Sequence, residues 1–189
     1  MPIDTLAGGF TDPSTASAHA FRAALEALAR PGRIETLAGG QAPAPVSEAA
    51  ATLLLTLCDP ETPVHLAGAH DSAEVRQWLA FHTGAPVVAP SQAMFALGTW
   101  AALAPLDAFP IGTPEYPDRS TTLIVEVESL TNRGARLTGP GIRDTACLSL
   151  PEVAAFQENG ALYPLGLDFF FTCSARLAGL PRSTKVEAL

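Results

Sequence analysis

Apolar residues recur at helical spacing in the first part of the chain. Phe21, Leu25 and Leu28 fall on one face of a predicted helix, which begins after Asp12-Pro13 and ends at Pro31-Gly32. The same spacing returns further along, separated by proline and glycine. The predicted helices cover about Ser14–Arg30, Ser47–Leu57, Asp71–Thr83, Trp100–Phe109 and Ser149–Asn159.

Polar residues at the predicted helix starts have capping chemistry. Ser47 precedes an apolar helical pattern and is predicted to be its N-cap. Asp71 with Glu74, and Ser149 with Glu152, have the spacing of a capping box, in which two side chains satisfy the first free amides of a helix.

Alternating and continuous apolar runs predict strands between these helices. Leu123, Val125 and Val127 alternate with more polar positions, which predicts a half-buried strand paired with Ala135–Thr138. Asp168–Cys173 carries three consecutive phenylalanines, as expected of a central strand covered on both faces. Shorter strands are predicted at Arg33–Leu37, Pro63–Leu66, Pro86–Val88 and Met94–Leu97. The pattern predicts a single α/β domain over residues 1–189, a three-layer sandwich with a mixed sheet between helical layers.

Composition narrows the class of protein. With 48% hydrophobic residues the chain can build a core, and a net charge of −8 disfavours nucleic-acid binding, which needs clustered positive charge. The mainly apolar stretch Ala93–Leu106 is about four residues too short to span a membrane. Met1–Asp4 has neither the basic nor the apolar part of a signal peptide, and the three cysteines form no CxxC motif. We therefore expect a cytoplasmic protein with free thiols.

Two segments carry positive charge without any carboxylate. Ser129–Arg143 and Phe169–Val186 each hold three basic residues and no acidic residue, within a chain of net charge −8. Each also contains a glycine turn and hydroxyl groups, which together with arginine bind phosphate-like anions or acidic partner surfaces. The alternative is that these arginines are simply solvated at strand ends. The candidate ligand- or partner-binding residues are Thr138, Gly139, Gly141, Arg143, Arg182, Ser183, Thr184 and His82.

Each candidate also has a structural interpretation. Gly139 and Gly141 start a glycine pattern that fits a tight turn between strands, and His82 fits a role at a helix end, bonding the last carbonyls. No standard zinc spacing occurs, so no metal site is predicted. The only lysine, Lys185, lies near the chain end, which argues against a pyridoxal phosphate Schiff base. No cofactor is predicted.

Seven short segments stand out by their joint order and spacing along the chain. They are Phe21-Arg22, Ala29–Gly32, Leu53–Pro63, Phe81–Pro86, Leu137–Ile142, Tyr163–Asp168 and Leu180–Thr184. Each segment alone is a weak signal, but together, over about Phe10–Glu187, they resemble the PhnH family of the bacterial carbon–phosphorus lyase system. Leu167 and Ser183 depart from the family pattern, which often has Ile and Thr there.

The resemblance implies a role in phosphonate catabolism. It implies a fold like the large domain of pyridoxal phosphate-dependent transferases, without the cofactor. It also implies partner subunits that together join an alkylphosphonate to the ribose of ATP and release adenine, before a radical iron–sulfur subunit breaks the carbon–phosphorus bond. The chain would be a subunit that is not self-sufficient, and a homodimer when alone. No catalytic residue is carried over from the family.

Two functions stay open from the sequence: a ligand-binding subunit, or a non-catalytic scaffold that only stabilises the complex. A ligand subunit requires the two carboxylate-free segments to converge on one pocket, whereas a scaffold requires an exposed apolar patch. For the first, Arg143→Ala or Arg182→Ala is expected to weaken binding about 10- to 100-fold with an unchanged melting temperature, and Arg76→Ala serves as control.

Overall fold

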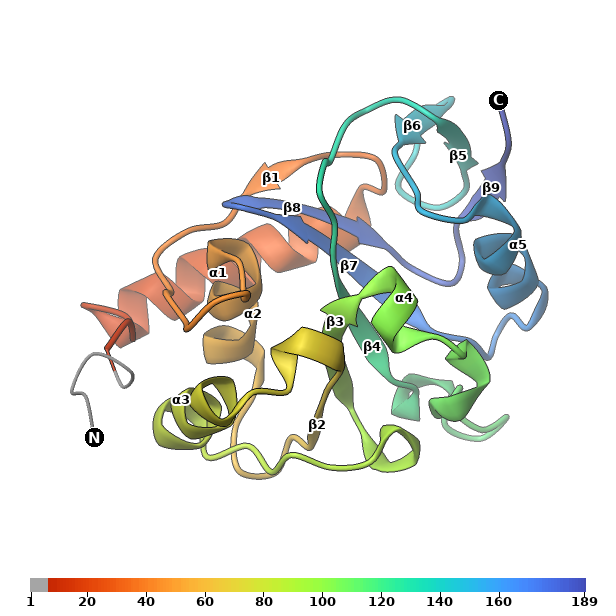
Figure 1. The fold of residues 1–189 in the computed structure, drawn as a ribbon. Coiled ribbons are helices and arrows are strands. Elements are labelled where there is room, and N and C mark those ends of the chain that lie inside the picture. Colours follow the sequence, from red (N-terminus) through yellow and green to blue (C-terminus); the bar gives the residue numbers. More distant parts are fainter. Residues whose placement is uncertain (1–6) are drawn as a thin grey trace.

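Helices and strands alternate over most of the chain (Figure 1). The structure, a computed structural model, describes residues 7–189. The helices are α1 (Pro13–Ala29), α2 (Glu48–Leu57), α3 (Ala73–Thr83), α4 (Trp100–Leu103) and α5 (Val153–Ala161). Short 3-10 helices lie at Gly68–His70, Pro90–Gln92, Leu106–Ala108 and Pro117–Arg119. The strands are β1 (Glu35–Thr36), β2 (Val64–Leu66), β3 (Phe95–Thr99), β4 (Thr122–Glu126), β5 (Ala135–Thr138), β6 (Ala146–Leu148), β7 (Asp168–Cys173), β8 (Arg176–Leu180) and β9 (Lys185–Glu187).

A six-stranded mixed sheet forms the centre of the fold, as predicted. Its order is β1-β8-β7-β4-β3-β2, with β2, β3, β4 and β7 parallel and β8 and β1 antiparallel to their neighbours. β7 lies between β4 and β8, which confirms the predicted central strand. The prediction that β4 is half-buried was wrong, because Ile124 is as fully buried as Leu123 and Val125. The strand has neighbours on both sides and layers on both faces.

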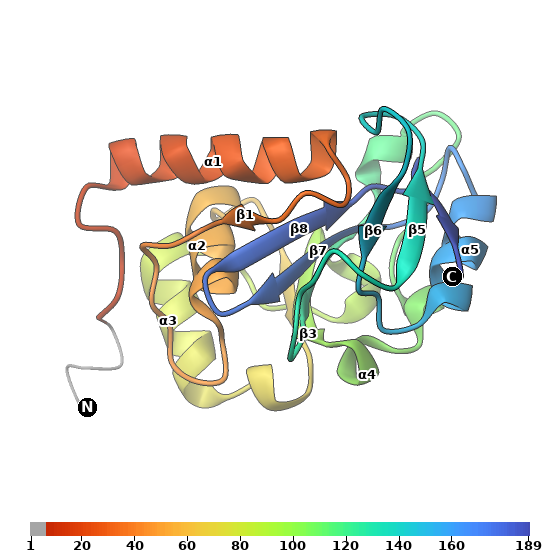
Figure 2. The same ribbon diagram turned by 90° about the horizontal axis from the view of Figure 1, so that it is seen from above.

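Alternate side chains of the sheet enter two separate cores. Leu97, Ile124 and Phe170 join the core beneath α1, α2 and α3. Leu123, Phe169 and Phe171 join the core shared with α5 and β5. Figure 2 shows the first three helices grouped on one side of the sheet, and α5 with the remaining strands on the other. The predicted three layers are therefore present.

A second, three-stranded sheet contains β5 and corrects one prediction. Ala135–Thr138 was expected to pair with β4, but β5 pairs with β6 and β9 in the order β6-β5-β9. Val127 leaves the central sheet after one further hydrogen bond to Thr172, and the chain then crosses to the small sheet. β5 thus pairs with the next strand, β6, and with β9 from the end of the chain, but not with the preceding strand, β4.

The buried stripe of α1 differs from the predicted one. The helix buries Ala20, Ala24 and Ala27, while Phe21 and Leu25 are 49% and 52% exposed. Alanine lets the helix lie close to its neighbours: at Gly179 of β8, an added Cβ would lie 2.7 Å from the carbonyl oxygen of Ala27. The small residues therefore form most of the contact face. Leu28 packs partly against the core, as predicted, whereas Phe21 and Leu25 face outward.

Helix caps were predicted correctly in one case and wrongly in two. Ser47 caps α2, its hydroxyl accepting from the amide of Ala50. At α3 the cap is Ser72, not Asp71, whose carboxylate instead binds Arg76. At α5 Glu152 occupies the N-cap position without a capping bond, and its side chain accepts a bond from Trp100.

Three predicted elements are shorter in the structure. The predicted strand Arg33–Leu37 is reduced to β1, and Pro86–Val88 is represented only by a bridge from Val87 to Val64. The predicted helix Trp100–Phe109 is broken into α4 and a 3-10 turn at Leu106–Ala108. Pro105 separates the two pieces, because it cannot donate a helical hydrogen bond.

The structure also bears on the expectations about thiols and membrane spans. The three cysteines are free, and burial raises the pKa of the Cys58 thiol to about 12. Between residues 7 and 189, no helix combines the length and the apolar character needed to cross a membrane. Met1–Asp4, on which the expectation about a signal peptide depends, lies outside the described residues.

Candidate functional site

The two carboxylate-free segments meet in the small sheet. Thr138 of β5 lies opposite Lys185 of β9 in an antiparallel pair. Gly139 follows with a φ of +131°, and a Cβ there would lie 3.2 Å from the carbonyl oxygen of Ser183. Glycine therefore lets the turn after β5 lie close to the backbone that leads into β9. The segments therefore converge in space, although Thr138 and Lys185 are 47 positions apart in the sequence.

A pocket of about 430 Å³ lies between α5 and β9, and we call it the α5–β9 pocket. Helix α5 forms one wall and the chain from Arg182 to Val186 forms the other. The side-chain amide of Gln157 donates to the carbonyl oxygen of Val186 at 3.0 Å and holds the two walls together. The lining residues are Pro140, Phe156, Gln157, Gly160, Tyr163, Arg182, Ser183, Thr184, Lys185 and Val186.

The hydroxyl of Thr184 lacks a partner inside this pocket. Thr184 is only 4% exposed, and its Oγ1 makes no hydrogen bond to any of residues 7–189. A buried polar group left unpaired costs about 1–3 kcal/mol. A ligand oxygen that reached this atom would accept the hydrogen bond and remove the cost. Thr184 is thus a residue of the pocket lining whose buried hydroxyl is unpaired.

Lys185 supplies positive charge at the edge of the pocket. It follows Thr184 directly, is exposed, and forms no ion pair with the described part of the chain. Arg136, its neighbour across the small sheet, is paired with Glu187 instead. An ammonium group at the edge of the pocket is suited to a phosphate or phosphonate oxygen.

Arg182 lines the pocket, but internal partners hold its guanidinium group. Its side chain is 11% exposed and forms an ion pair with Asp168 at 2.5 Å. Nη1 donates to the carbonyl oxygen of Pro117 at 2.7 Å, and Nη2 also donates to the hydroxyl of Ser120. Arg182 thus ties β7 to the loop before β4. The expectation that Arg182→Ala leaves the melting temperature unchanged does not fit this geometry.

The turn between β5 and β6 is built around the second candidate glycine. Gly141 has a φ of +80°, and a Cβ there would lie 1.9 Å from the carbonyl oxygen of Ala29 at the end of α1. The amide of Ile142 donates to Gly139 at 3.2 Å and closes the turn. This agrees with the structural interpretation of the glycine pattern. Arg143 follows, exposed beside Asp144, and is not among the residues that line the α5–β9 pocket.

His82 lies in a different layer from the other candidates. It occupies the last turn of α3, where its ring lies 5.1 Å from that of Trp78 and 5.0 Å from that of Phe81. Its ring also lies against Gly9, where a Cβ would be 2.8 Å from Cε1. The fold therefore brings together Thr138, Gly139 and the chain from Arg182 to Lys185, but not His82.

Sequence reasoning missed the wall of the pocket that α5 supplies. Phe156, Gln157 and Gly160 line it, together with Tyr163 just after the helix. Tyr163 lies in one of the segments that resemble the PhnH family, so this motif was a usable signal. Gln157 carried no signal, because only the packing of α5 on β9 gives it a role.

A second polar cluster lies at the carboxyl ends of the parallel strands, where α/β proteins often bind ligands. Here Glu126 of β4 accepts from the amide of Ser47 at 2.6 Å and from the hydroxyl of Thr172 at 3.0 Å. His70 is 2% exposed, and neither ring nitrogen has a hydrogen-bond partner among the described residues. Burial lowers the pKa of His70, and the charge of Glu126 opposes this effect more weakly. The carboxylate is thus occupied by protein groups, and the α5–β9 pocket remains the better candidate.

The described residues contain no group of three or more His, Cys, Asp or Glu side chains placed to hold a metal ion. The groups that the α5–β9 pocket offers a ligand come from its lining: a hydroxyl, an ammonium group and aromatic side chains.

Comparison with known proteins gives consistent matches over nearly the whole chain. The family model described as bacterial phosphonate metabolism protein (PhnH) matches residues 8–187. A relative from Rhizobium meliloti (strain 1021), named alpha-D-ribose 1-methylphosphonate 5-triphosphate synthase subunit PhnH, is 41% identical over 191 residues, covering 95% of this chain and 94% of the relative. A relative from Stutzerimonas stutzeri, named putative C-P lyase subunit protein HtxG, is 28% identical over 180 residues, covering 89% of this chain and 84% of the relative.

Proposed function

The chain belongs to the PhnH family of bacterial phosphonate metabolism proteins, and from this premise we propose that it is a subunit of a ribose 1-alkylphosphonate 5-triphosphate synthase. Its proposed partners are the other subunits of a carbon–phosphorus lyase system, as the names of both relatives support. The complex would join an alkylphosphonate to the ribose of ATP. We infer a cytoplasmic location, because the proposed reaction consumes ATP.

Within this complex, we propose that the α5–β9 pocket binds a phosphate- or phosphonate-bearing group. The observation that carries the proposal is the unpaired hydroxyl of Thr184, buried in a pocket that also contains Lys185. The net charge of −8 repels anions, but salt screens this repulsion beyond about 8–10 Å. Local groups therefore decide whether an anion binds.

The test measures the affinity of the protein for methylphosphonate and for ATP by calorimetry, alone and in the assembled complex. Lys185→Ala and Thr184→Val are each expected to weaken binding of one of these probes about tenfold or more, because each removes a contact of roughly 1.5 kcal/mol. Arg76→Ala is the matched control, because Arg76 lies on α3, in the opposite layer, where it pairs with Asp71. Unchanged affinity for both probes in both variants would exclude the pocket as the anion site.

A second candidate function is the non-catalytic scaffold. An apolar groove beside Trp100, described below, favours it because such a surface fits a protein partner. The two functions differ in one result. A scaffold leaves product formation by the reconstituted synthase unaffected in Lys185→Ala, whereas a ligand subunit loses it.

Four finer proposals follow, three of them from family membership and one from the position of Arg143. We propose that the protein is a homodimer without its partners and that it works without pyridoxal phosphate, since Lys185 stands exposed on β9. We also propose that the central sheet is related to the large domain of pyridoxal phosphate transferases. Arg143, exposed outside the pocket, is proposed to contact an acidic surface of a partner subunit.

A further inference from the structure

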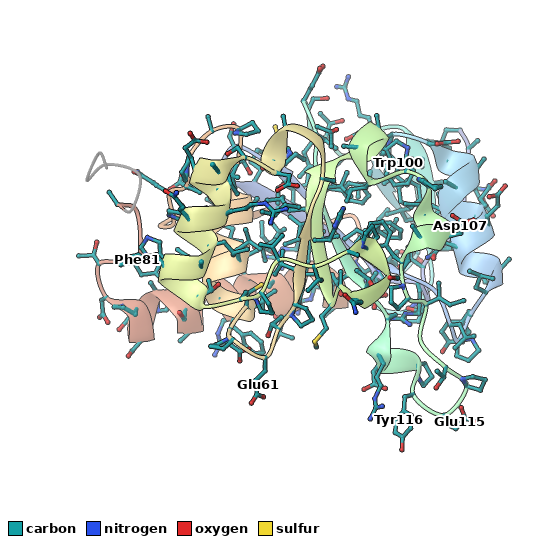
Figure 3. All side chains as sticks on the ribbon, turned by 60° about the horizontal axis from the view of Figure 1, so that its bottom comes forward. Glu61, Phe81, Trp100, Asp107, Glu115 and Tyr116 are labelled. Carbon is teal, nitrogen blue, oxygen red and sulfur yellow. The ribbon has the colours of Figure 1, made fainter. Side chains whose placement is uncertain are left out.

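A groove of about 650 Å³ lies beside Trp100, between the α4 segment and α5, and we call it the Trp100 groove. Figure 3 shows Trp100 and Asp107 on the same part of the surface, next to α5. Most lining residues are apolar, and four are polar. They are Trp100, Ala104, Pro105, Leu106, Asp107, Phe109, Ile111, Glu152, Ala155, Glu158, Asn159, Leu162 and Leu167.

The apolar wall is fixed in position by the core behind it. The ring of Trp100 lies 4.8 Å from that of Phe156 and 6.3 Å from that of Phe169. Its indole nitrogen donates to Glu152 at 3.1 Å, which fixes the ring from the other side. Leu162 remains 45% exposed at the end of α5. A rigid aromatic wall beside an exposed leucine is typical of a surface that binds an apolar side chain.

The polar groups of the groove are carboxylates. Asp107, Glu152 and Glu158 line it, and within residues 7–189 none of them forms an ion pair with an arginine or lysine. The fourth polar residue is Asn159, whose side-chain amide is bound to the backbone of Leu167. Its Nδ2 donates to the carbonyl oxygen of Leu167 at 2.9 Å, and its Oδ1 accepts from the amide of Leu167 at 2.8 Å. The groove therefore presents apolar surface with unneutralised negative charge.

The negative charge of the Trp100 groove restricts the class of molecule that can bind there. Phosphonates and nucleotides are anions and would be repelled by three carboxylates. A second copy of this chain, placed groove to groove across a two-fold axis, would set the same carboxylates against one another. A protein segment with basic residues would instead find opposite charge at the rim, and its apolar side chain would cover Trp100 and Leu162.

We infer that the Trp100 groove docks a segment of another synthase subunit, one that presents an apolar side chain flanked by arginine or lysine. The inference rests on the proposed function, since it takes the partner from that complex. Glu158 and Leu162 face the groove, while Gln157 and Gly160 of the same helix face the α5–β9 pocket. A partner docked in the groove would thus lie beside the pocket, on the other side of α5.

The test measures the affinity of the purified assembly of the remaining synthase subunits for this protein by biolayer interferometry. Asp107→Lys and Glu158→Lys are each expected to weaken binding about tenfold or more, and Leu162→Ser to weaken it without changing its salt dependence. Binding of the parent is expected to weaken as salt rises from about 0.05 to 0.5 M. Glu61→Lys is the matched control, because Glu61 is an exposed carboxylate that Figure 3 places away from the groove.

The outcomes separate this inference from the proposed function. If the parent does not bind the remaining subunits, the proposed function fails, and the inference fails with it. If the parent and Glu61→Lys bind, and both groove reversals bind equally well, the inference alone is overturned. If the reversals change the protein's own oligomeric mass and leave partner affinity unchanged, the occupant is a second copy and the inference is again overturned.

Discussion

At the scale of single residues, Arg182 shows how a charge can be present for structural reasons. Its guanidinium joins Asp168, Pro117 and Ser120, which belong to β7 and to the loop before β4. Removing one partner of a buried ion pair leaves the other charge uncompensated. Arg182 therefore shapes the α5–β9 pocket by fixing one of its walls. A substitution of Arg182 that changes ligand binding acts at least in part through the loss of these structural contacts.

We predict that Arg182→Ala lowers the free energy of unfolding by about 3 kcal/mol, measured by urea denaturation. The matched control is Arg136→Ala, because Arg136 also pairs with a carboxylate, Glu187, but both side chains are about half exposed. The control is expected to lose less than about 1 kcal/mol. Equal losses in the two variants would show that the Arg182 network contributes no more than a surface pair.

The second prediction at this scale concerns His70 and pH. Burial lowers its pKa in the folded protein, while the unfolded chain keeps the ordinary value of about 6.5. The unfolded state therefore binds a proton first as the pH falls, and the free energy of unfolding decreases below about pH 6.5. The charge of Glu126, the acidic group that acts on His70, reduces this effect but does not reverse it.

Chemical denaturation at about pH 7.5 and 5.5 tests this prediction. His70→Leu is expected to lose part of the decrease seen in the parent, whereas His19→Gln, on the exposed side of α1, is expected to keep it. Asp12, Asp59 and Asp71 also have lowered pKa values, but from 3.8, so they act at more acidic pH. The same decrease in all three proteins would show that His70 is not its source.

At the scale of elements, α5 connects the two surfaces of interest. One side of this helix borders the α5–β9 pocket and the other borders the Trp100 groove. Its packing on β9 is reinforced by Gln157, which donates to the backbone of Val186. A nine-residue helix can serve both surfaces because residues three and four positions apart share a face.

At the scale of the whole molecule, we predict a homodimer of about 39 kDa without partners, twice the 19.6 kDa chain. The apolar stretch Ala93–Leu106 gives little reason for a dimer, because β3 occupies much of it inside the sheet. Phe21 and Leu25 on the outer face of α1 now give a better reason, since a monomer exposes both to water.

Sedimentation at micromolar concentration measures this mass directly. The charge reversals Asp107→Lys and Glu158→Lys are expected to leave it unchanged, since the Trp100 groove repels a second copy. A monomer mass for the parent protein would contradict the dimer.

The sequence by itself determined the class of fold and much of its order. Helical spacing located α1, α2 and α3, and the three phenylalanines of β7 identified the central strand, because burial on both faces requires apolar residues at every position. The motifs shared with the PhnH family identified the chain as a member, which the comparisons confirm. These properties depend on local pattern or on order along the chain.

Only the tertiary structure decided which distant residues meet. The pairing of β5 with β9 places Thr138 opposite Lys185, and no local pattern encodes a partner from the chain end. The tertiary structure also pairs Arg182 with Asp168, leaves the hydroxyl of Thr184 unpaired, and groups the carboxylates beside Trp100. Whether a charge is neutralised or free depends on the three-dimensional neighbours of a side chain, which is why the sequence could name candidate residues but not their roles.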